Sequence, residues 1–226
     1  TTIVDSGFME ALETEYGRDI SVVPGSTAEL LELARQGAVD AVVVHDEQQE
    51  LEYVAAHPNA TRKEVFTSRF LLVGPAELVQ SIPTDSITQA MTSIAAAGYT
   101  FVTRDDGSGT HSREMALWAQ ADVSPGGNWY VSTGQGMGLT LQVADQIGGF
   151  TLVEAGVFVS AADTIDLVPL QINDHEALVN RYSAIRVSQD GADFFDWLVG
   201  DAGAAAVAVA SEAIFGGPLY TATTAP

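Results

Sequence analysis

Short apolar segments that read as β-strands alternate with amphipathic segments that read as helices along most of the chain. Residues 39–44 form a nearly continuous apolar run, as expected for a strand that is covered on both faces. The helix before it begins at Ser26, with Glu29 placed as in a capping box, and ends near Gly37. This βαβα order predicts a parallel, doubly wound α/β sheet rather than a β-sandwich or a helix bundle.

The same alternation continues through the chain and suggests two lobes. Further helices are expected over residues 86–97, 109–121, 138–147 and 190–210, and strands over 20–23, 66–73, 100–103, 129–132, 150–153, 167–172 and 182–187. Two long strands, near 68–75 and 180–187, are predicted to act as hinges that run between the lobes. Lobe 1 then comprises residues 1–75 and 182–226, and lobe 2 comprises residues 76–181.

The chain of 226 residues carries 30 acidic and 9 basic side chains, which gives a formal net charge of −21. Such a surface repels phosphate backbones and anionic membranes, so we expect no nucleic-acid partner, and it favours a soluble monomer. The lack of cysteine excludes disulfides, zinc–thiolate sites and cysteine nucleophiles. The sequence contains no run of about 18 apolar residues, so it predicts no membrane span. The start at Thr1, without a methionine or a signal-like segment, suggests a processed chain.

Polar and flexible residues are concentrated in one loop between a predicted strand and a predicted helix. The loop reads Thr103-Arg104-Asp105-Asp106-Gly107-Ser108-Gly109-Thr110-His111. Gly107 and Gly109 let the backbone approach a ligand closely, and the free N–H groups of a helix start carry partial positive charge. Ser108 and Thr110 add hydroxyl donors, and Arg104 adds a planar charged fork. The loop therefore predicts an oxyanion socket, with a capped helix and a solvated arginine as the alternative.

Two other helix starts carry similar residues. Ser26 follows Gly25 at the start of one helix, and Thr1 and Thr2 precede the helix that contains Phe8. The alternative interpretation is that Ser26 only caps its helix and that the two threonines form a frayed end.

Several motifs, in order and spacing, resemble the tungstate-binding solute receptors of ABC importers. The matching segments are Thr1-Thr2 with Asp5-Ser6-Gly7, Val42-Val43-Val44-His45-Asp46, Leu72-Val73-Gly74-Pro75, residues 104–111 with Glu114, Leu117 and Trp118, Trp129-Tyr130, Gly134-Gln135-Gly136-Met137-Gly138, Thr140-Leu141 and Gly149-Phe150-Thr151-Leu152. The resemblance covers nearly the whole chain.

This resemblance implies a type II periplasmic-binding-protein fold. Two α/β lobes, each a parallel or mixed sheet flanked by helices, would close by a hinge on an oxyanion held in the cleft. The implied protein is an extracytoplasmic receptor and not an enzyme. It would bind tungstate or molybdate without a separate cofactor, metal or catalytic residue, and its partner would be the membrane permease of an ABC importer. The implied ligand contacts are Thr1, Thr2, Ser26, Arg104 and Ser108, with Gly109, Thr110 and Gly136 as further donors or lining residues.

The chain departs from the family pattern at two places. The first strand of the family, expected just before Thr1, is missing from this sequence, and without it Thr1 and Thr2 would lose their anchor. The glycine that usually follows the position of Ser26 is Thr27 here, so less bare backbone is available for the ligand.

The choice of anion is expected to depend on Asp106. Tungstate is a tetrahedral dianion without a proton near neutral pH and suits a site of donors only, whereas phosphate keeps a proton and gains from one acceptor. The loop also resembles the socket of phosphate-binding receptors, in which an aspartate takes that proton. An Asp106 carboxylate in the cleft would favour phosphate, and one bonded to backbone or to Arg104 would favour tungstate or molybdate. Sulfate is also free of protons, so charge does not separate it from tungstate.

Two other classes of function are weighed against this one. A serine hydrolase would use Ser108 with His111, but the G-x-S-x-G elbow is absent because Asp106 and Gly107 precede the serine. A secreted domain that has kept the fold and lost its ligand is the second alternative, which the departure at Thr27 leaves open. The histidines are scattered, without the spacing of metal ligands.

Overall fold

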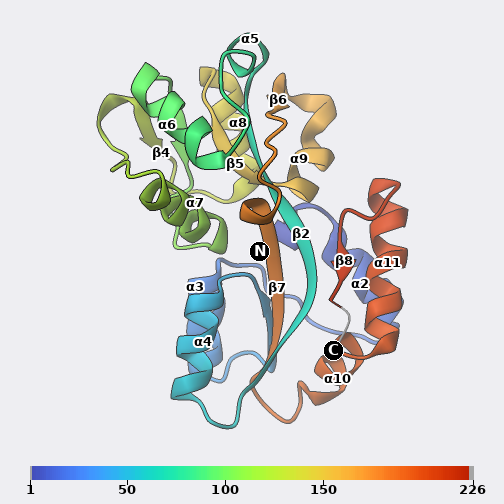
Figure 1. The fold of residues 1–226 in the computed structure, drawn as a ribbon. Helices are drawn as coiled ribbons and strands as arrows, with labels where there is room; N and C mark the ends of the chain where they lie inside the picture. The colour runs from blue at the N-terminus through green and yellow to red at the C-terminus, as the bar shows by residue number, and fades with distance from the viewer. Residues whose placement is uncertain (1, 224–226) are drawn as a thin grey trace. The chain divides into compact units, whose positions relative to one another are not determined.

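The computed structural model describes residues 2–223, which form two compact units (Figure 1). The terminal unit contains the chain up to Ser68 and again from Asn180, and the middle unit contains Arg69–Val179. The first division falls inside strand β2 (Thr61–Pro75), and the second falls after the first residue of strand β7 (Val179–Arg186).

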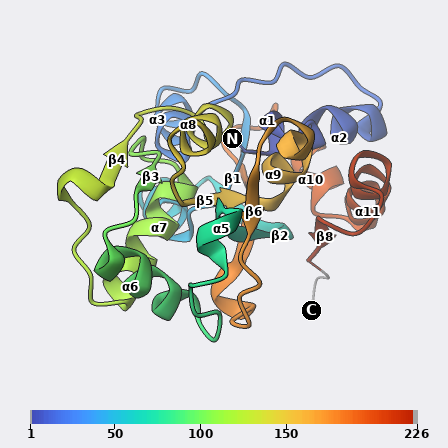
Figure 2. The ribbon, with the colours of Figure 1, turned by 90° about the horizontal axis from the view of Figure 1, so that it is seen from above.

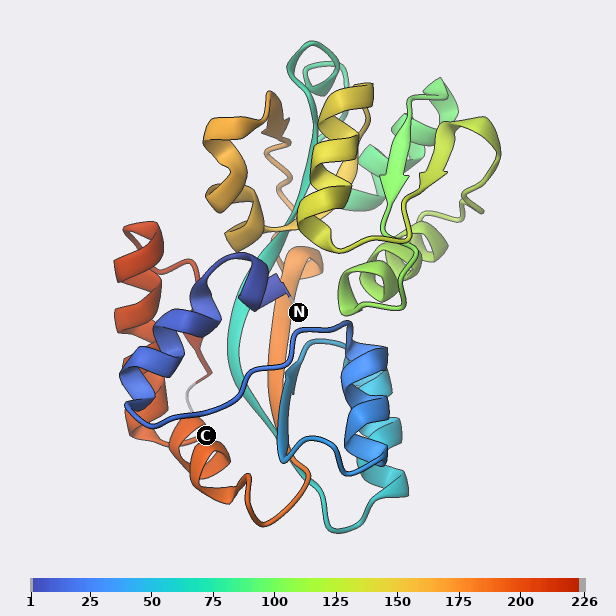
Figure 3. The same cartoon turned by 180° about the vertical axis from the view of Figure 1, so that it is seen from behind.

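The terminal unit is built on three neighbouring strands, in the order β1–β7–β2. Strand β1 (Ala41–Val44) pairs antiparallel with β7, and β8 (Thr221–Ala222) pairs antiparallel with β2. Helices α3 (Thr27–Arg35) and α4 (Glu47–Ala56) lie on one side of these strands (Figures 1 and 3). The other side is covered by α2 (Phe8–Tyr16), α10 (Ala192–Leu198) and α11 (Asp201–Phe215), and the short α1 (Thr2–Asp5) precedes α2.

Each side of the strands in the terminal unit has its own hydrophobic core. The core under α3 and α4 contains Leu31, Val44, Tyr53 and Ile185. The core on the other side is aromatic, with Phe8, Phe66, Tyr182 and Tyr220 among its buried members. Within it, the rings of Phe8 and Tyr220 stack with their centroids 3.9 Å apart.

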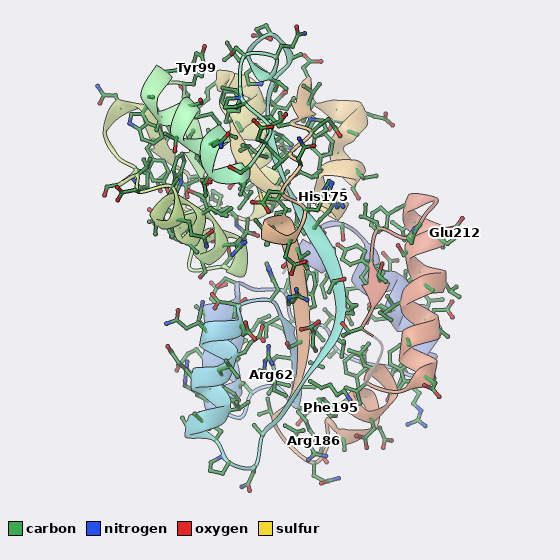
Figure 4. All side chains as sticks on the ribbon, in the orientation of Figure 1. Arg62, Tyr99, His175, Arg186, Phe195 and Glu212 are labelled. Atoms are coloured by element: carbon green, nitrogen blue, oxygen red, sulfur yellow. The ribbon has the colours of Figure 1, made fainter. Side chains whose placement is uncertain are left out.

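A buried ion pair joins α4 to β2. The Glu50 side chain is 1% exposed, and its Oε2 accepts a hydrogen bond of 2.7 Å from Nε of Arg62. Arg62 lies beside α4 (labelled in Figure 4). Burial raises the pKa of the Glu50 carboxyl, and the charge and hydrogen bond of Arg62 act against that rise.

Replacing Arg62 with methionine is therefore expected to destabilise the protein strongly. The variant would leave a buried carboxylate without its cation, a change that costs about 3–5 kcal/mol in comparable buried pairs. Urea unfolding at pH 7 measures the effect, with Arg35→Met as the matched control because both members of the Arg35–Glu32 pair are exposed. A loss below about 1 kcal/mol in Arg62→Met would contradict the assignment.

The middle unit contains the other end of β2, which pairs antiparallel with β5 (Thr151–Glu154) and with β6 (Leu167–Pro169). Strands β3 (Phe101–Thr103) and β4 (Tyr130–Ser132) pair in parallel, and a parallel bridge joins Phe101 to Phe150. The helices of this unit are α5 (Ala76–Val79), α6 (Ile87–Ala97), α7 (Gly109–Gln120), α8 (Met137–Ile147) and α9 (Ala155–Ala161). Helices α6 and α7 lie side by side (Figures 1 and 2), and α8 packs against β3 and β5.

The predicted parallel, doubly wound sheet is only partly present. The pairings of β2 with β5, β6 and β8, and that of β1 with β7, are antiparallel, whereas the β3–β4 pair and the Phe101–Phe150 bridge are parallel. Apolar periodicity identifies a strand but carries no information on the direction of its neighbours. Strand β1 is covered on both faces as predicted, because Val42 and Val44 belong to the core under α3 and α4 and Val43 packs against the aromatic core on the other side.

The strand predicted over residues 20–23 is absent, and this prediction was wrong. The segment has no assigned secondary structure, and Val22 and Val23 are 36% and 46% exposed. Within residues 2–223, β1 pairs with β7 only, so its other edge faces a groove of about 430 Å³ that residues 19–23 also line. An extended segment without a partner strand makes no ladder hydrogen bonds, so the apolar run alone did not produce a strand.

The predicted closing helix over residues 190–210 is instead two helices, α10 and α11, which meet at 70°. Gly203 packs so closely that a Cβ atom would lie 2.4 Å from the carbonyl oxygen of Leu198, which makes the tight bend possible. Within the described residues, no single helix has both the length and the apolar composition that a membrane crossing needs, and only this bent pair passes that test jointly.

Candidate functional site

The start of α7 offers several hydrogen-bond donors. Ser108 caps the helix by accepting a 3.3 Å hydrogen bond from the N–H of His111. Within residues 2–223, the backbone N–H groups of Gly109 and Thr110 make no hydrogen bond, as expected for the first turn of a helix. The Thr110 side chain is 1% exposed, and its Oγ1 also lacks a partner there. These groups form a cluster of donors at the positive end of a helix, which suits an anion.

Arg104 and Asp106 form a fixed pair beside these donors. The Arg104 residue is 6% exposed, and its Nε and Nη2 donate to Oδ2 of Asp106 at 3.0 and 2.6 Å. Oδ1 of Asp106 accepts from the backbone N–H of Ser108 at 3.1 Å. Within the described chain, Nη1 of Arg104 makes no hydrogen bond. Both oxygens of the carboxylate are therefore occupied, while part of the guanidinium stays available.

The pKa of the Asp106 carboxyl lies below its ordinary value, which favours the charged form. Burial alone would raise this pKa, but the hydrogen bonds from Ser108 and the charge of Arg104 outweigh burial and lower it. The loop thus holds an ionised carboxylate by its own donors, which is the arrangement that the sequence argument associates with tungstate or molybdate rather than phosphate.

Backbone conformation shapes the same loop. Asp105 and Gly107 have φ angles of 50° and 69°, in the left-handed region that only glycine adopts easily. The Asp105 carboxylate accepts a 2.8 Å hydrogen bond from the Ser132 hydroxyl, which ties the loop to the end of β4. Two contacts therefore fix the loop conformation: the hydrogen bond from Ser132 to Asp105, and the Arg104–Asp106 pair within the loop.

A buried carboxyl group lies behind the loop, on the inner face of α7. Glu114 is 2% exposed, and its Oε1 accepts from Nε1 of Trp118 at 3.0 Å and from the Tyr130 hydroxyl at 2.6 Å. Burial raises the pKa of Glu114 to about 7, although these hydrogen bonds act to lower it. Glu114 joins α7 to β4 and so positions the helix start from within the core.

The start of α3, in the terminal unit, has the same pattern of donors. Ser26 and Glu29 form a complete capping box, with Ser26 N donating to Oε2 of Glu29 at 2.8 Å and Glu29 N donating to the Ser26 hydroxyl at 3.3 Å. Within residues 2–223, the N–H groups of Thr27 and Ala28 have no partner, and neither has the buried Oγ1 of Thr27. Ser26 therefore caps the helix, and in the described chain the cap leaves the N–H groups of Thr27 and Ala28 and the hydroxyl of Thr27 free.

The other predicted contacts differ in how they are placed. Thr2 is buried, with its hydroxyl 2.7 Å from that of Tyr182. Thr1 lies outside the described residues. Gly136 is exposed at the N-cap of α8, and its neighbour Thr133 donates from its backbone to the carbonyl of Thr103, at the end of β3.

The middle unit therefore gathers Arg104, Ser108, Gly109 and Thr110 in one loop and helix start, with Gly136 on an adjoining loop. Thr2 and Ser26 belong to the terminal unit. Within residues 2–223, no three carboxylate or imidazole groups gather as a resident metal would require.

Sequence reasoning missed the chemical role of two of these residues. The sequence comparison treats Thr27 only as the replacement of a glycine, and the sequence leaves two alternatives for the partner of Asp106. A threonine in the first turn of a serine-capped helix is a usable signal for an extra donor. An Asp two residues after Arg in a tight loop is a weaker signal for self-pairing.

Two mixed α/β units, one inserted in the chain of the other, define the class of two-lobed solute-binding proteins with a type II periplasmic-binding-protein fold. The model of the PBP superfamily domain matches residues 1–202, and the chain belongs to this superfamily. The fold class implied by the resemblance is thereby confirmed.

Individual relatives agree with this assignment. The tungstate-binding protein TupA of Peptoclostridium acidaminophilum is 32% identical over 238 residues, which cover 98% of this chain and 82% of the relative. The solved structure of the tungstate ABC transporter from Geobacter sulfurreducens aligns with a TM-score of 0.80 at 30% identity, covering 91% of this chain and 94% of that one. The tungstate-binding protein TupA from Desulfovibrio alaskensis G20 aligns with a TM-score of 0.79 at 26% identity, covering 100% and 96%.

Proposed function

We propose that the chain is an extracytoplasmic receptor that binds one tungstate or molybdate ion and delivers it to the membrane permease of an ABC importer. The names of the similar proteins support the anion, the class of transporter and a binding role without catalysis. The strong negative charge supports a monomer, because copies of such a surface repel each other.

One observation carries the choice of ligand: the site residues offer many free donors and no free carboxylate. In the described chain, Gly109 and Thr110 present free N–H groups, and Thr110 adds a buried hydroxyl without a partner. Both oxygens of the Asp106 carboxylate accept hydrogen bonds from Arg104 or Ser108. A proton-free tetrahedral dianion needs only donors. Charge-assisted hydrogen bonds contribute about 1.5–3 kcal/mol each, so four or five of them support micromolar to nanomolar affinity.

Each unit carries its own candidate donors, and we expect one ion to be bound per chain. In the terminal unit, the candidate ligand contacts are Ser26 and Thr2. In the middle unit, they are Arg104, Ser108, Gly109, Thr110 and Gly136. Thr1 is included on the strength of the resemblance alone.

Two alternatives receive less support. A phosphate receptor would need an acceptor for the phosphate proton, and the Asp106 carboxylate is occupied. A serine hydrolase would need the His111 ring to bond the Ser108 hydroxyl, but that hydroxyl accepts from the backbone of His111. The ring lies 3.8 Å from the Asp105 carboxylate instead.

A thermal-shift panel with tungstate, molybdate, sulfate and phosphate tests the proposal. A ligand at 100 times its dissociation constant stabilises the folded form by about 2.7 kcal/mol. For a chain of this size, that corresponds to a rise of about 5–10 °C in Tm. We expect this rise for tungstate and molybdate and none for phosphate, and the sulfate sample measures selectivity among proton-free dianions, which charge does not separate.

Calorimetry on the same samples gives the stoichiometry, expected to be one ion per chain. A dominant response to phosphate, or no response to any of the four anions, would refute the proposed ligand. Chloride at equal ionic strength serves as the control for general salt effects.

A further inference from the structure

The side chain of Thr27 is a buried polar group without a partner. Thr27 is the first residue of α3 and is 1% exposed, and its Oγ1 makes no hydrogen bond within residues 2–223. Buried hydroxyl groups are nearly always hydrogen-bonded, and leaving one unsatisfied costs about 1–3 kcal/mol. The lack of a protein partner for the buried Thr27 hydroxyl within the described residues is explained if the hydroxyl bonds a ligand.

The buried side-chain atoms without a hydrogen bond in the described chain fall into two groups: those whose side chain has a protein acceptor within reach and those whose side chain has none. The hydroxyls of Thr103 and Ser183 lie within reach of the buried carboxylates of Glu114 and Glu50. The Nε of Arg113 belongs to a guanidinium that donates elsewhere, to the carbonyl of Ala177. The two further buried side-chain atoms without a partner within residues 2–223 are the hydroxyls of Thr27 and Thr110.

These two hydroxyls belong to the first turns of helices in different units, Thr27 as the first residue of α3 and Thr110 as the second residue of α7. Each is in the first turn of a helix capped by a serine, next to two free backbone N–H groups. Helix α6 provides a contrast, because it is also capped by a serine, Ser86, but the Thr88 hydroxyl in its first turn lies 3.1 Å from that serine. An unpartnered threonine is therefore not a general property of serine-capped helices in this protein.

We propose that the Thr27 hydroxyl donates a hydrogen bond to the bound oxyanion and so adds a ligand contact to the site. This inference rests on the proposed function. The hydroxyl joins the N–H groups of Thr27 and Ala28 as a third donor, and the nearby Glu29 carboxylate is already engaged by the backbone of Ser26. The threonine thus adds a donor at the position where its departure from glycine leaves less bare backbone for the ligand.

Calorimetric titration with sodium tungstate tests this inference in four proteins: the wild type, Thr27→Val, Thr27→Ser and Thr88→Val. Valine keeps the shape of threonine and removes the donor, so we expect the affinity of Thr27→Val to fall by about 10-fold or more. Thr27→Ser keeps the hydroxyl and is expected to stay within about threefold of the wild type. Thr88→Val, with its partnered hydroxyl, is expected to leave affinity unchanged.

The melting temperature without ligand gives a second readout that does not depend on binding. Because the hydroxyl has no protein partner, Thr27→Val is expected to melt at or above the temperature of the wild type. A lower melting temperature would show that the hydroxyl has a structural partner and would overturn the inference. So would an unchanged affinity for tungstate in Thr27→Val.

The two proposals fail in distinguishable ways. If the wild type binds tungstate and Arg104→Ala does not, while Thr27→Val binds normally, only the role of Thr27 is wrong. If the wild type binds none of the four oxyanions, the proposed function is wrong and the role of Thr27 falls with it.

Discussion

Replacing Arg104 with alanine is expected to weaken tungstate binding by about 100-fold or more, because a guanidinium supplies charge-assisted hydrogen bonds of about 1.5–3 kcal/mol each. A second effect adds to this loss. Arg104 occupies Oδ2 of Asp106, so its removal leaves a negative charge beside the donors that hold the dianion. Calorimetric titration with tungstate measures the change directly.

The double variant Arg104→Ala/Asp106→Asn separates these two effects. Asparagine removes the negative charge, so the double variant is expected to regain part of the lost affinity. Arg18→Ala is the control for net charge, because it removes the same charge from an exposed pair with Asp193. Affinity within about threefold of the wild type in Arg104→Ala would exclude this loop as the binding site.

Replacing Glu114 with glutamine is expected to remove a pH-dependent loss of stability. The folded-state pKa of Glu114 is about 7, above the ordinary value of 4.5. A carboxyl group with a raised pKa favours the folded state while it is neutral in both states. Its contribution is therefore complete below about pH 4.5 and is lost as the pH rises through about 7. The difference in pKa corresponds to about 3 kcal/mol.

Urea unfolding between pH 4.5 and 8 tests this expectation. The wild type should lose about 3 kcal/mol relative to Glu114→Gln over that range, because the glutamine cannot ionise. Glu47→Gln is the control, since the Glu47 side chain is 70% exposed. Parallel stability curves for the wild type and Glu114→Gln would show that Glu114 has an ordinary pKa.

Much of the helix pattern could be predicted from local sequence, because caps and apolar periodicity are local properties. Ser26, Ser86 and Ser108 each begin a helix where the sequence indicated one. Strand direction could not be predicted in the same way. The antiparallel pairing of β1 with β7 joins residues far apart in the chain, and nothing in the apolar run of β1 specifies its neighbour.

The candidate site was predictable to a similar degree. The loop from Arg104 to Thr110 was identified because glycines, hydroxyls and a helix start occur together. The engagement of Asp106 depends on the positive φ angles of Asp105 and Gly107, which turn the chain so that the carboxylate meets both Arg104 and Ser108. The raised pKa of Glu114 depends on burial under Trp118 and Tyr130, which tertiary packing decides.

The insertion of the middle unit into the chain of the terminal unit has a consequence for biosynthesis. Residues 69–179 form one continuous stretch, whereas the terminal unit needs β7, α10 and α11, which come after that stretch. Domains fold as units while the ribosome extends the chain. The middle unit can therefore complete its core during translation. The N-terminal part of the terminal unit can complete its own core only after β7, α10 and α11 have been synthesised.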